Sequence, residues 1–165
     1  MLLLFCSLVW AIRDGVDDTV DTAVVGIVDA STNGECTGTL IAPDLVLTAR
    51  HCVSEILGFG CDATWGATLE ADRFYVTTKS SYSFNLSDYH PVAKVIVDAQ
   101  KTGLCGGDVA LVVLKEPIDT TEAVPIAPRV DGEVAVGESY AAVGYGATDD
   151  NGTGSGSRRR RDGLV

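Results

Sequence analysis

Short apolar runs separated by Gly, Pro, Asn and Asp make up most of the chain between residues 23 and 114. The runs are rich in Val, Ile, Leu and Tyr, a composition and spacing typical of strands. They predict strands over residues 23–28, 35–42, 45–48, 74–78, 93–97 and 110–114. Six such strands can close a small barrel, which leaves no free sheet edge. The pattern therefore predicts an all-β protein with little helix and one near-complete six-stranded barrel.

The segments between these runs predict the domain organisation. Pro43 and Asp44 predict a tight turn, because proline presets one backbone dihedral angle and aspartate can bond to its own backbone. Residues 57–72 and 79–89 predict loops, and the proline-containing residues 115–130 predict a crossing to a second barrel. A strand over residues 139–143 would open that barrel. The predicted domains are residues 1–11 as a signal remnant, 12–125 as the first barrel and 126–165 as the truncated start of the second.

Composition limits the partners of the chain. A length of 165 residues with 46% hydrophobic residues suffices for one good core. The net charge of −11 argues against nucleic acid or an anionic membrane as a partner, because phosphate binding requires clustered Lys and Arg. The basic residues 158–161 follow a Gly/Ser stretch and are predicted to lie in a solvated loop, with a processing site or an anion patch as the alternatives.

The acidic residues Asp17, Asp18 and Asp21 form a second charged cluster. They lack the glycine and the distal glutamate of a calcium-binding loop, so we predict a solvated turn. No Cys-x-x-Cys spacing that would suggest zinc occurs either. The sequence therefore predicts no metal and no cofactor.

His51 and Asp108 are the candidates for catalysis. His51 lies in the run Thr-Ala-Arg-His-Cys and is predicted to occupy a single helical turn just beyond a strand. Asp108 precedes Val-Ala-Leu-Val at the mouth of an apolar strand. A histidine base and an aspartate that orients it are two of the three groups that a Ser-His-Asp hydrolase requires. The other histidine, His90, precedes a proline in a polar segment and is predicted to be a surface residue.

These runs resemble the trypsin/chymotrypsin-like serine protease family. In that family Thr-Ala-Ala-His-Cys carries the catalytic histidine and an Asp-Ile-Ala-Leu-Leu-type block carries the buried aspartate. Arg50 replaces the usual small residue, and its guanidinium could compete for the Asp108 carboxylate. The resemblance extends over residues 12–146 through Cys-Thr-Gly-Thr-Leu-Ile at 36–41, Gly-Tyr-Gly at 144–146 and the order of histidine before aspartate. It implies a trypsin-like fold and a serine-type endopeptidase, with His51 as the general base and Asp108 as its orienting group.

The nucleophile expected from this resemblance is absent from the sequence. The family places its serine in a Gly-Asp-Ser-Gly-Gly block beyond the Gly-Tyr-Gly element, and Ser139, Ser155 and Ser157 lie neither in that block nor in a Gly-x-Ser-x-Gly elbow. We therefore predict an N-terminal fragment of the enzyme that is inactive alone. The alternative is a non-catalytic protease homologue that acts as a secreted binding module.

The cysteines and the first residues predict an exported protein. Residues 1–11 are apolar and resemble the hydrophobic part of a secretory signal, which includes Cys6. The remaining four cysteines permit three pairings. The resemblance implies a disulfide between Cys36 and Cys52, and with it one between Cys61 and Cys105. A secreted or extracytoplasmic location follows, since disulfides persist in oxidising compartments.

Ile12 is a candidate for activation. The run Ile-Arg-Asp-Gly at 12–15 is similar to the mature start of the family, whose freed α-amino group pairs with the aspartate before the serine. Arg13 and Asp14 depart from the family pattern at this point. The resemblance thus implies that Ile12 is the activation N-terminus, that the substrate is a protein or peptide, and that the protein is a monomer.

Overall fold

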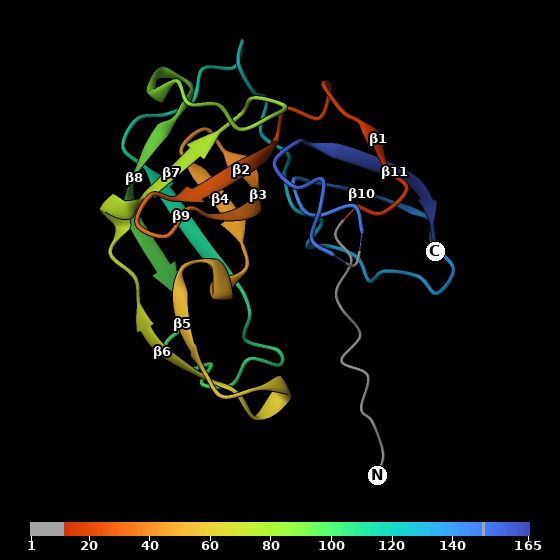
Figure 1. Ribbon diagram of the computed structural model, residues 1–165. Coiled ribbons are helices and arrows are strands. Elements are labelled where there is room, and N and C mark those ends of the chain that lie inside the picture. The colour runs from red at the N-terminus through yellow and green to blue at the C-terminus, as the bar shows by residue number, and fades with distance from the viewer. Residues whose placement is uncertain (1–11, 150) are drawn as a thin grey trace.

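The computed structural model describes residues 12–149 and 151–165, and over these residues it is built from strands and single-turn 3-10 helices (Figure 1). The strands are β1 (Val16–Asp17), β2 (Val24–Asp29), β3 (Gly34–Ala42), β4 (Leu45–Thr48), β5 (Ser54–Leu57), β6 (Thr64–Thr68), β7 (Phe74–Thr77), β8 (His90–Val97), β9 (Ala110–Leu114), β10 (Tyr140–Gly144) and β11 (Arg159–Leu164). The 3-10 helices are η1 (Arg50–Cys52), η2 (Gly60–Asp62), η3 (Ala71–Arg73) and η4 (Leu86–Asp88). The predicted signal remnant, residues 1–11, lies outside the described residues.

Six antiparallel strands close a barrel in the order β2-β3-β4-β9-β8-β7. They are the six strands that the apolar runs predict, although β8 begins at His90 rather than at residue 93. Closure pairs the backbone groups of every strand on both sides, so the barrel has no edge. The all-β class and the six-stranded barrel are confirmed.

The core fills the inside of this barrel. Ala110, Val112 and Leu114 of β9 are buried, and the residues between them are partly exposed, which is the alternation of a half-buried strand. Residues from the other barrel strands and from the segments that follow them join the same cluster. Burial of these apolar side chains is the main force that holds the barrel together.

A hairpin carries the chain to the candidate histidine. β3 and β4 are joined through Pro43 and Asp44, so the predicted tight turn is confirmed. β4 ends at Thr48, and η1 begins at Arg50. His51 therefore lies in one helical turn at an end of the barrel, as predicted.

The segment after η1 is a hairpin that the sequence did not predict. β5 and β6 pair antiparallel and extend away from the barrel, with η2 at the far end (Figure 1). The prediction of a loop over residues 57–72 is therefore wrong for β6. Its run Thr-Trp-Gly-Ala-Thr is short and contains a glycine, so it lacks the alternation of a strand.

A second, three-stranded sheet in the order β1-β11-β10 lies beside the barrel (Figure 1). Strand β10 matches the strand predicted at residues 139–143. The Tyr145 side chain, directly after β10, is buried and donates a hydrogen bond from its hydroxyl to the Lys79 carbonyl (2.6 Å). The Tyr145 amide donates to Thr37 Oγ1 (3.0 Å), so this residue joins the second sheet to the barrel. The boundary between residues 125 and 126 stays a prediction.

The solvated loop predicted for residues 158–161 is wrong. Arg158 is buried, and Arg159–Leu164 forms the central strand of the second sheet. The solvated turn is also wrong for Asp18, which is buried and paired with Arg158. Like charges repel within each cluster, and folding brings the two clusters together through the Asp18–Arg158 and Asp21–Arg160 ion pairs and the β1–β11 pairing. That pairing places Asp17 opposite Arg159.

In the described residues, no helix has the length and apolar composition that crossing a bilayer requires.

Candidate active site

His51 and Asp108 meet at the end of the barrel. His51 lies in η1, and Asp108 directly precedes Val109 and β9. The Asp108 carboxylate accepts two hydrogen bonds from this one residue: the His51 amide donates to Oδ1 (2.8 Å), and ring Nδ1 lies 2.8 Å from Oδ2. β4 pairs with β9, with Thr48 opposite Ala110, so the barrel itself brings together two residues that are 57 positions apart.

The second oxygen of the carboxylate determines the orientation of the ring. An ionised carboxylate accepts only, so the bond requires the proton on Nδ1 and leaves Nε2 as the acceptor. The His51 side chain is 47% exposed, whereas that of Asp108 is 32% exposed. The arrangement thus presents an oriented, accessible imidazole that can take a proton at Nε2.

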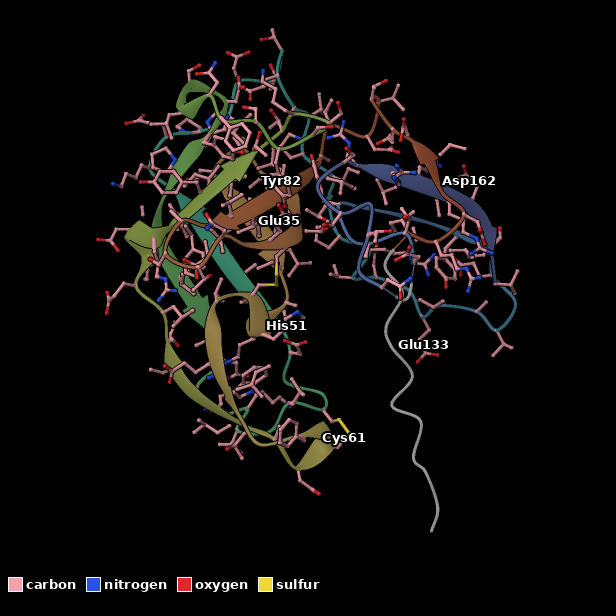
Figure 2. All side chains as sticks on the ribbon, in the orientation of Figure 1. Glu35, His51, Cys61, Tyr82, Glu133 and Asp162 are labelled. Atoms are coloured by element: carbon pink, nitrogen blue, oxygen red, sulfur yellow. A yellow bond between two sulfur atoms is a disulfide. The ribbon has the colours of Figure 1, made fainter. Side chains whose placement is uncertain are left out.

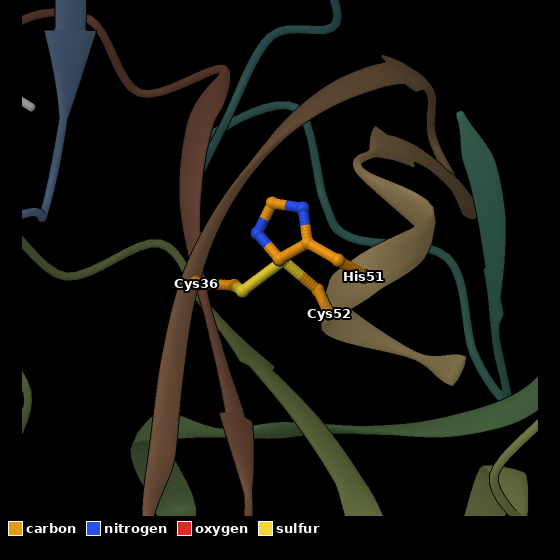
Figure 3. Close-up of side chains that lie close together, drawn as sticks. All are labelled: Cys36, His51 and Cys52. Carbon is orange, nitrogen blue, oxygen red and sulfur yellow. A yellow bond between two sulfur atoms is a disulfide. The ribbon is translucent and has the colours of Figure 1, made fainter. Parts of the chain in front are cut away.

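The Cys36–Cys52 disulfide supports the same turn. It joins β3 to η1 with a Cα–Cα distance of 6.2 Å. Figure 3 shows the His51 ring beside this bridge. The two sulfur atoms and a ring nitrogen lie within 4.8 Å of one another, but both sulfurs are consumed by the disulfide. Without a thiolate, the cluster does not have the donors of a metal site.

A hollow of about 450 Å³ opens next to His51. The barrel side of its lining contains Glu35 and the Cys36–Cys52 bridge, and residues 145–147 and Ser155 line it from the direction of the second sheet. Figure 2 shows His51 on the flank of the barrel that faces that sheet. The imidazole therefore borders a space large enough for part of a peptide.

Arg50 does not take the Asp108 carboxylate. Its side chain is buried, and Nη1 donates to the carbonyl oxygens of Asp98 (3.0 Å) and Lys101 (2.8 Å). The guanidinium also lies over the Trp65 ring, 4.8 Å from its centroid. The competition that the sequence suggested is thereby avoided, because the Arg50 guanidinium bonds to main-chain carbonyls of residues 98 and 101 and not to the Asp108 carboxylate.

The segment before Asp108 is held by the β5–β6 hairpin. Trp65 Nε1 donates to the Gly103 carbonyl (3.2 Å), and the Leu104 amide donates to the Ala63 carbonyl (3.0 Å). Cys61 and Cys105 form the second disulfide, with a Cα–Cα distance of 5.1 Å. Both cysteine pairs thus match those that the resemblance implied. Sequence reasoning missed Trp65, because a lone tryptophan in an apparent loop carries no signal of its partner.

No serine hydroxyl among the described residues makes a hydrogen bond to the His51 ring. Ser155 is exposed at the hollow, and Ser139 is exposed on the approach to β10. Ser157 Oγ pairs with Ser81 Oγ at 2.9 Å. The structure therefore brings together the two candidate residues His51 and Asp108, and it does not add a nucleophile to them from these serines.

The remaining candidates lie elsewhere. Ile12 is buried and lies beside the end of β10: its Cγ1 would be 3.7 Å from a Cβ atom placed on Gly144. His90, predicted to be a surface residue, begins β8 with its side chain 24% exposed, and Nε2 lies 2.9 Å from Glu122 Oε1. Burial alone raises the pKa of Glu122, but hydrogen bonds from Thr78 and His90 outweigh it and lower this pKa below its usual value.

Comparison with known proteins identifies the family. The family model described as Trypsin matches residues 16–161. Glandular kallikrein-10 from Rattus norvegicus is 31% identical over 117 residues, which are 68% of this chain and 43% of the kallikrein. The crystal structure of a scabies mite inactivated protease paralogue, S-D1, has the same fold, with a TM-score of 0.70 and 16% identity over 92% of this chain and 61% of that one. The chain spans less than two thirds of either relative, yet the family model covers most of it. The chain therefore belongs to the trypsin family.

Proposed function

We propose that this chain supplies the base and its orienting group to a serine-type endopeptidase. The observation that carries the proposal is the double hydrogen bond from His51 to the Asp108 carboxylate. A bond to the amide and a bond to the ring of the same residue fix the imidazole in one tautomer and one orientation. That is the preparation a general base needs before it can activate a hydroxyl group.

In the proposed reaction, a serine oxygen attacks the carbonyl carbon of a peptide bond and its proton passes to His51 Nε2. Asp108 stabilises the imidazolium without taking the proton itself. The C–N bond then breaks as the imidazolium gives its proton to the leaving amine, which leaves an acyl-enzyme. Water, deprotonated by the same imidazole, attacks the ester carbon; the bond from that carbon to the serine oxygen breaks, the imidazolium returns its proton to the serine, and the second product leaves as a carboxylic acid. The serine, the oxyanion amides and the specificity pocket come from parts of a trypsin-type domain that these residues do not include.

The family implies protein or peptide substrates, and we propose a monomer that acts outside the cytoplasm. Two disulfides support this location, because such bonds persist in oxidising compartments. The hollow beside His51 supports a polypeptide substrate, since it leaves Nε2 accessible. We also propose that cleavage before Ile12 creates the N-terminus that activates the enzyme.

A non-catalytic protease homologue that binds a partner is the second candidate. One observation favours it: among the described residues, no serine hydroxyl is bound to the His51 ring. The scabies mite protein, described as an inactivated protease paralogue, shows that the barrel persists without activity. In this alternative the hydrogen bonds between His51 and Asp108 would stabilise the fold and take no part in catalysis.

The coding sequence that follows Val165 separates the two candidates. For the enzyme we expect a frame that continues into Gly-Asp-Ser-Gly-Gly, and a full product that hydrolyses peptide esters and reacts with a fluorophosphonate. The 165-residue chain alone should not react. A stop codon at this point, or a full product that neither labels nor cleaves, favours the binding module.

Substitution of Asp108 tests the role of the pair in that full product. Asp108→Asn should lower kcat about 10⁴-fold, because an amide that donates to Nδ1 stabilises the wrong tautomer. Asp119→Asn is the matched control, since among the described residues the Asp119 carboxylate accepts hydrogen bonds only from Thr121, within its own turn. Equal activities of the two variants would contradict the proposed mechanism.

A further inference from the structure

Arg50 is a buried cation that no carboxylate neutralises among the described residues. Arg50 is 6% exposed, Nη1 donates to two main-chain carbonyls, and Nε has no hydrogen-bond partner within the described part of the chain. A charge removed from water lowers stability unless specific hydrogen bonds compensate for it. The carbonyls of Asp98 and Lys101 and the face of Trp65 provide that compensation. The location of these groups indicates what the cation holds in place.

Both carbonyls belong to the segment that leads to Asp108. Residues 98–107 connect β8 to Asp108 and contain no strand or helix of their own. Gly103, Gly106 and Gly107 lie in it, and each glycine gives the unfolded segment extra conformational freedom. Such a segment holds a carboxylate at a fixed position only where other elements anchor it.

Trp65 provides a second, indirect contact between Arg50 and residues 98–107. The guanidinium lies over its ring, and the same side chain donates from Nε1 to the Gly103 carbonyl. The Trp65 amide adds a bond to the Thr102 carbonyl (3.3 Å). Arg50 therefore contacts the segment directly at its first half and indirectly, through Trp65, at its middle.

We propose that Arg50 is a positioning residue for the His51–Asp108 pair. It precedes His51 in the same 3-10 turn, so one side chain links the turn that bears the imidazole to the segment that bears the carboxylate. A small side chain at position 50 could not reach the carbonyls of Asp98 and Lys101. The proposal rests on the role proposed for the pair, and it adds that this chain aligns the pair through a buried guanidinium.

The proposal predicts different effects for two substitutions. Arg50→Ala removes both hydrogen bonds and the stacking on Trp65, so the carboxylate should lose its fixed distance from Nδ1. Arg50→Lys keeps the charge, but a compact ammonium lacks the planar fork of the guanidinium, which reaches both carbonyls while its carbon lies over the Trp65 ring. We expect the alanine variant to lose the alignment and the lysine variant to recover part of it.

The test is the state of the His51 ring, observed by NMR on protein with ¹⁵N-labelled histidine. The chain has two histidines, so His90→Gln assigns the signals. In the native protein we expect His51 to be a single Nδ1–H tautomer with a low-field ring proton. Arg50→Ala should lose that proton signal and show a mixture of tautomers, and Arg50→Lys should show a weakened signal.

Arg73→Ala is the matched control. Arg73 is partly buried and donates two hydrogen bonds to the Asp29 carboxylate, and among the described residues its side chain makes no hydrogen bond to the turn of His51 or to residues 98–107. The Arg73→Ala protein should have a lower free energy of unfolding and still show the Nδ1–H signal of His51. An unchanged signal in folded Arg50→Ala, or equal losses in Arg50→Ala and Arg73→Ala, would overturn the proposal.

Two further outcomes keep the test decisive. If Arg50→Ala does not fold, Arg50→Lys and Trp65→Phe take its place in the test. The phenylalanine keeps an aromatic ring but removes the hydrogen bond to the Gly103 carbonyl. An Nδ1–H signal of His51 at native intensity in both variants contradicts the proposal. If the native protein itself lacks the Nδ1–H signal, the His51–Asp108 pair fails and the role of Arg50 fails with it. A native signal that Arg50→Ala leaves intact contradicts the role of Arg50 alone.

Discussion

Arg158 and Asp18 form an ion pair inside the protein although they are 140 positions apart in the chain. Arg158 Nε lies 2.9 Å from Asp18 Oδ2, and the two side chains are 1% and 2% exposed. Arg158 Nη1 also donates to the carbonyls of Val24 (2.9 Å) and Thr78 (3.1 Å). One guanidinium thus joins the N-terminal segment, the barrel and the start of β11.

Removal of one partner of this pair should destabilise the protein strongly. Asp18→Asn leaves a buried guanidinium without its counter-charge, and breaking a buried pair in this way costs about 3–5 kcal/mol. The free energy of unfolding in urea measures the effect. Arg160→Met is the control, because the side chains of Arg160 and its partners Asp21 and Asp162 reach solvent, and solvent-exposed ion pairs contribute little to stability. Similar losses in both variants would mean that burial of Arg158 is unimportant.

The two disulfides should both form in the oxidised protein, and each should contribute about 2–4 kcal/mol. Cys61–Cys105 spans 44 positions and Cys36–Cys52 spans 16, so loss of the first should cost more in the chain-entropy account. Double alanine variants, unfolded by urea, provide the comparison. Peptide mapping without reduction checks the pairing, and a peptide that links Cys52 to Cys61 would contradict the structure around His51.

The Asp29–Arg73 pair should make stability fall in acid. Hydrogen bonds from Arg73 Nε (3.0 Å) and Nη2 (2.6 Å) lower the pKa of Asp29 to about 2 in the folded protein. The unfolded value is about 3.9, so the folded form binds the proton less readily. The stabilisation, about 2 kcal/mol, is present above the unfolded pKa and disappears as the pH falls towards 2.

Asp29→Asn isolates this contribution. The difference in unfolding free energy between the native protein and the variant should be constant from pH 7 down to about 5 and then shrink as the pH approaches 2. A series of urea titrations at these pH values measures it. A difference that stays constant over the whole range would show that Arg73 does not shift the pKa of Asp29.

Gly107 should be intolerant of a side chain. A Cβ atom there would lie 2.5 Å from the Gly103 carbonyl oxygen, which is main chain and cannot move without displacing the segment before Asp108. We expect Gly107→Ala to cost about 1–3 kcal/mol and to disturb the low-field proton of His51. Gly103→Ala is the control, since the nearest atom to its Cβ would be 4.0 Å away. Urea unfolding and the NMR signal report the two effects, and equal stability of both variants would contradict the predicted clash.

The barrel could be predicted from the sequence because its signals are local. The alternation in Ala-Leu-Val-Val-Leu of β9 and the Pro43-Asp44 turn each express a backbone preference within a few residues. β6 escaped prediction for the opposite reason. Its Thr-Trp-Gly-Ala-Thr becomes a strand through pairing with β5, and the Trp65 ring then finds its partners in Arg50 and Gly103.

The candidate site divides in the same way. His51 and Asp108 were recognisable because their neighbouring residues resemble those of a known family, although nothing local shows that the two meet. Their contact depends on the register of β4 against β9. Arg50 illustrates the limit: the sequence marks it as a departure from the family, whereas its partners Asp98 and Lys101 depend on the tertiary fold.

The amino-acid sequence was enough to predict the strands of the barrel, the turn that presents His51 and the two candidate catalytic residues. The positions of the charged side chains of residues 17–21 and 158–161, in contrast, depend on the fold. The acidic residues 17–21 and the basic residues 158–161 were each predicted to lie in water. When β1 lies along β11, Asp18 and Arg158 form a buried ion pair and Asp17 lies opposite Arg159. The physical reason is that hydrophobic alternation acts over a few residues, whereas the desolvation of a charge is compensated only by a partner that folding brings from elsewhere in the chain.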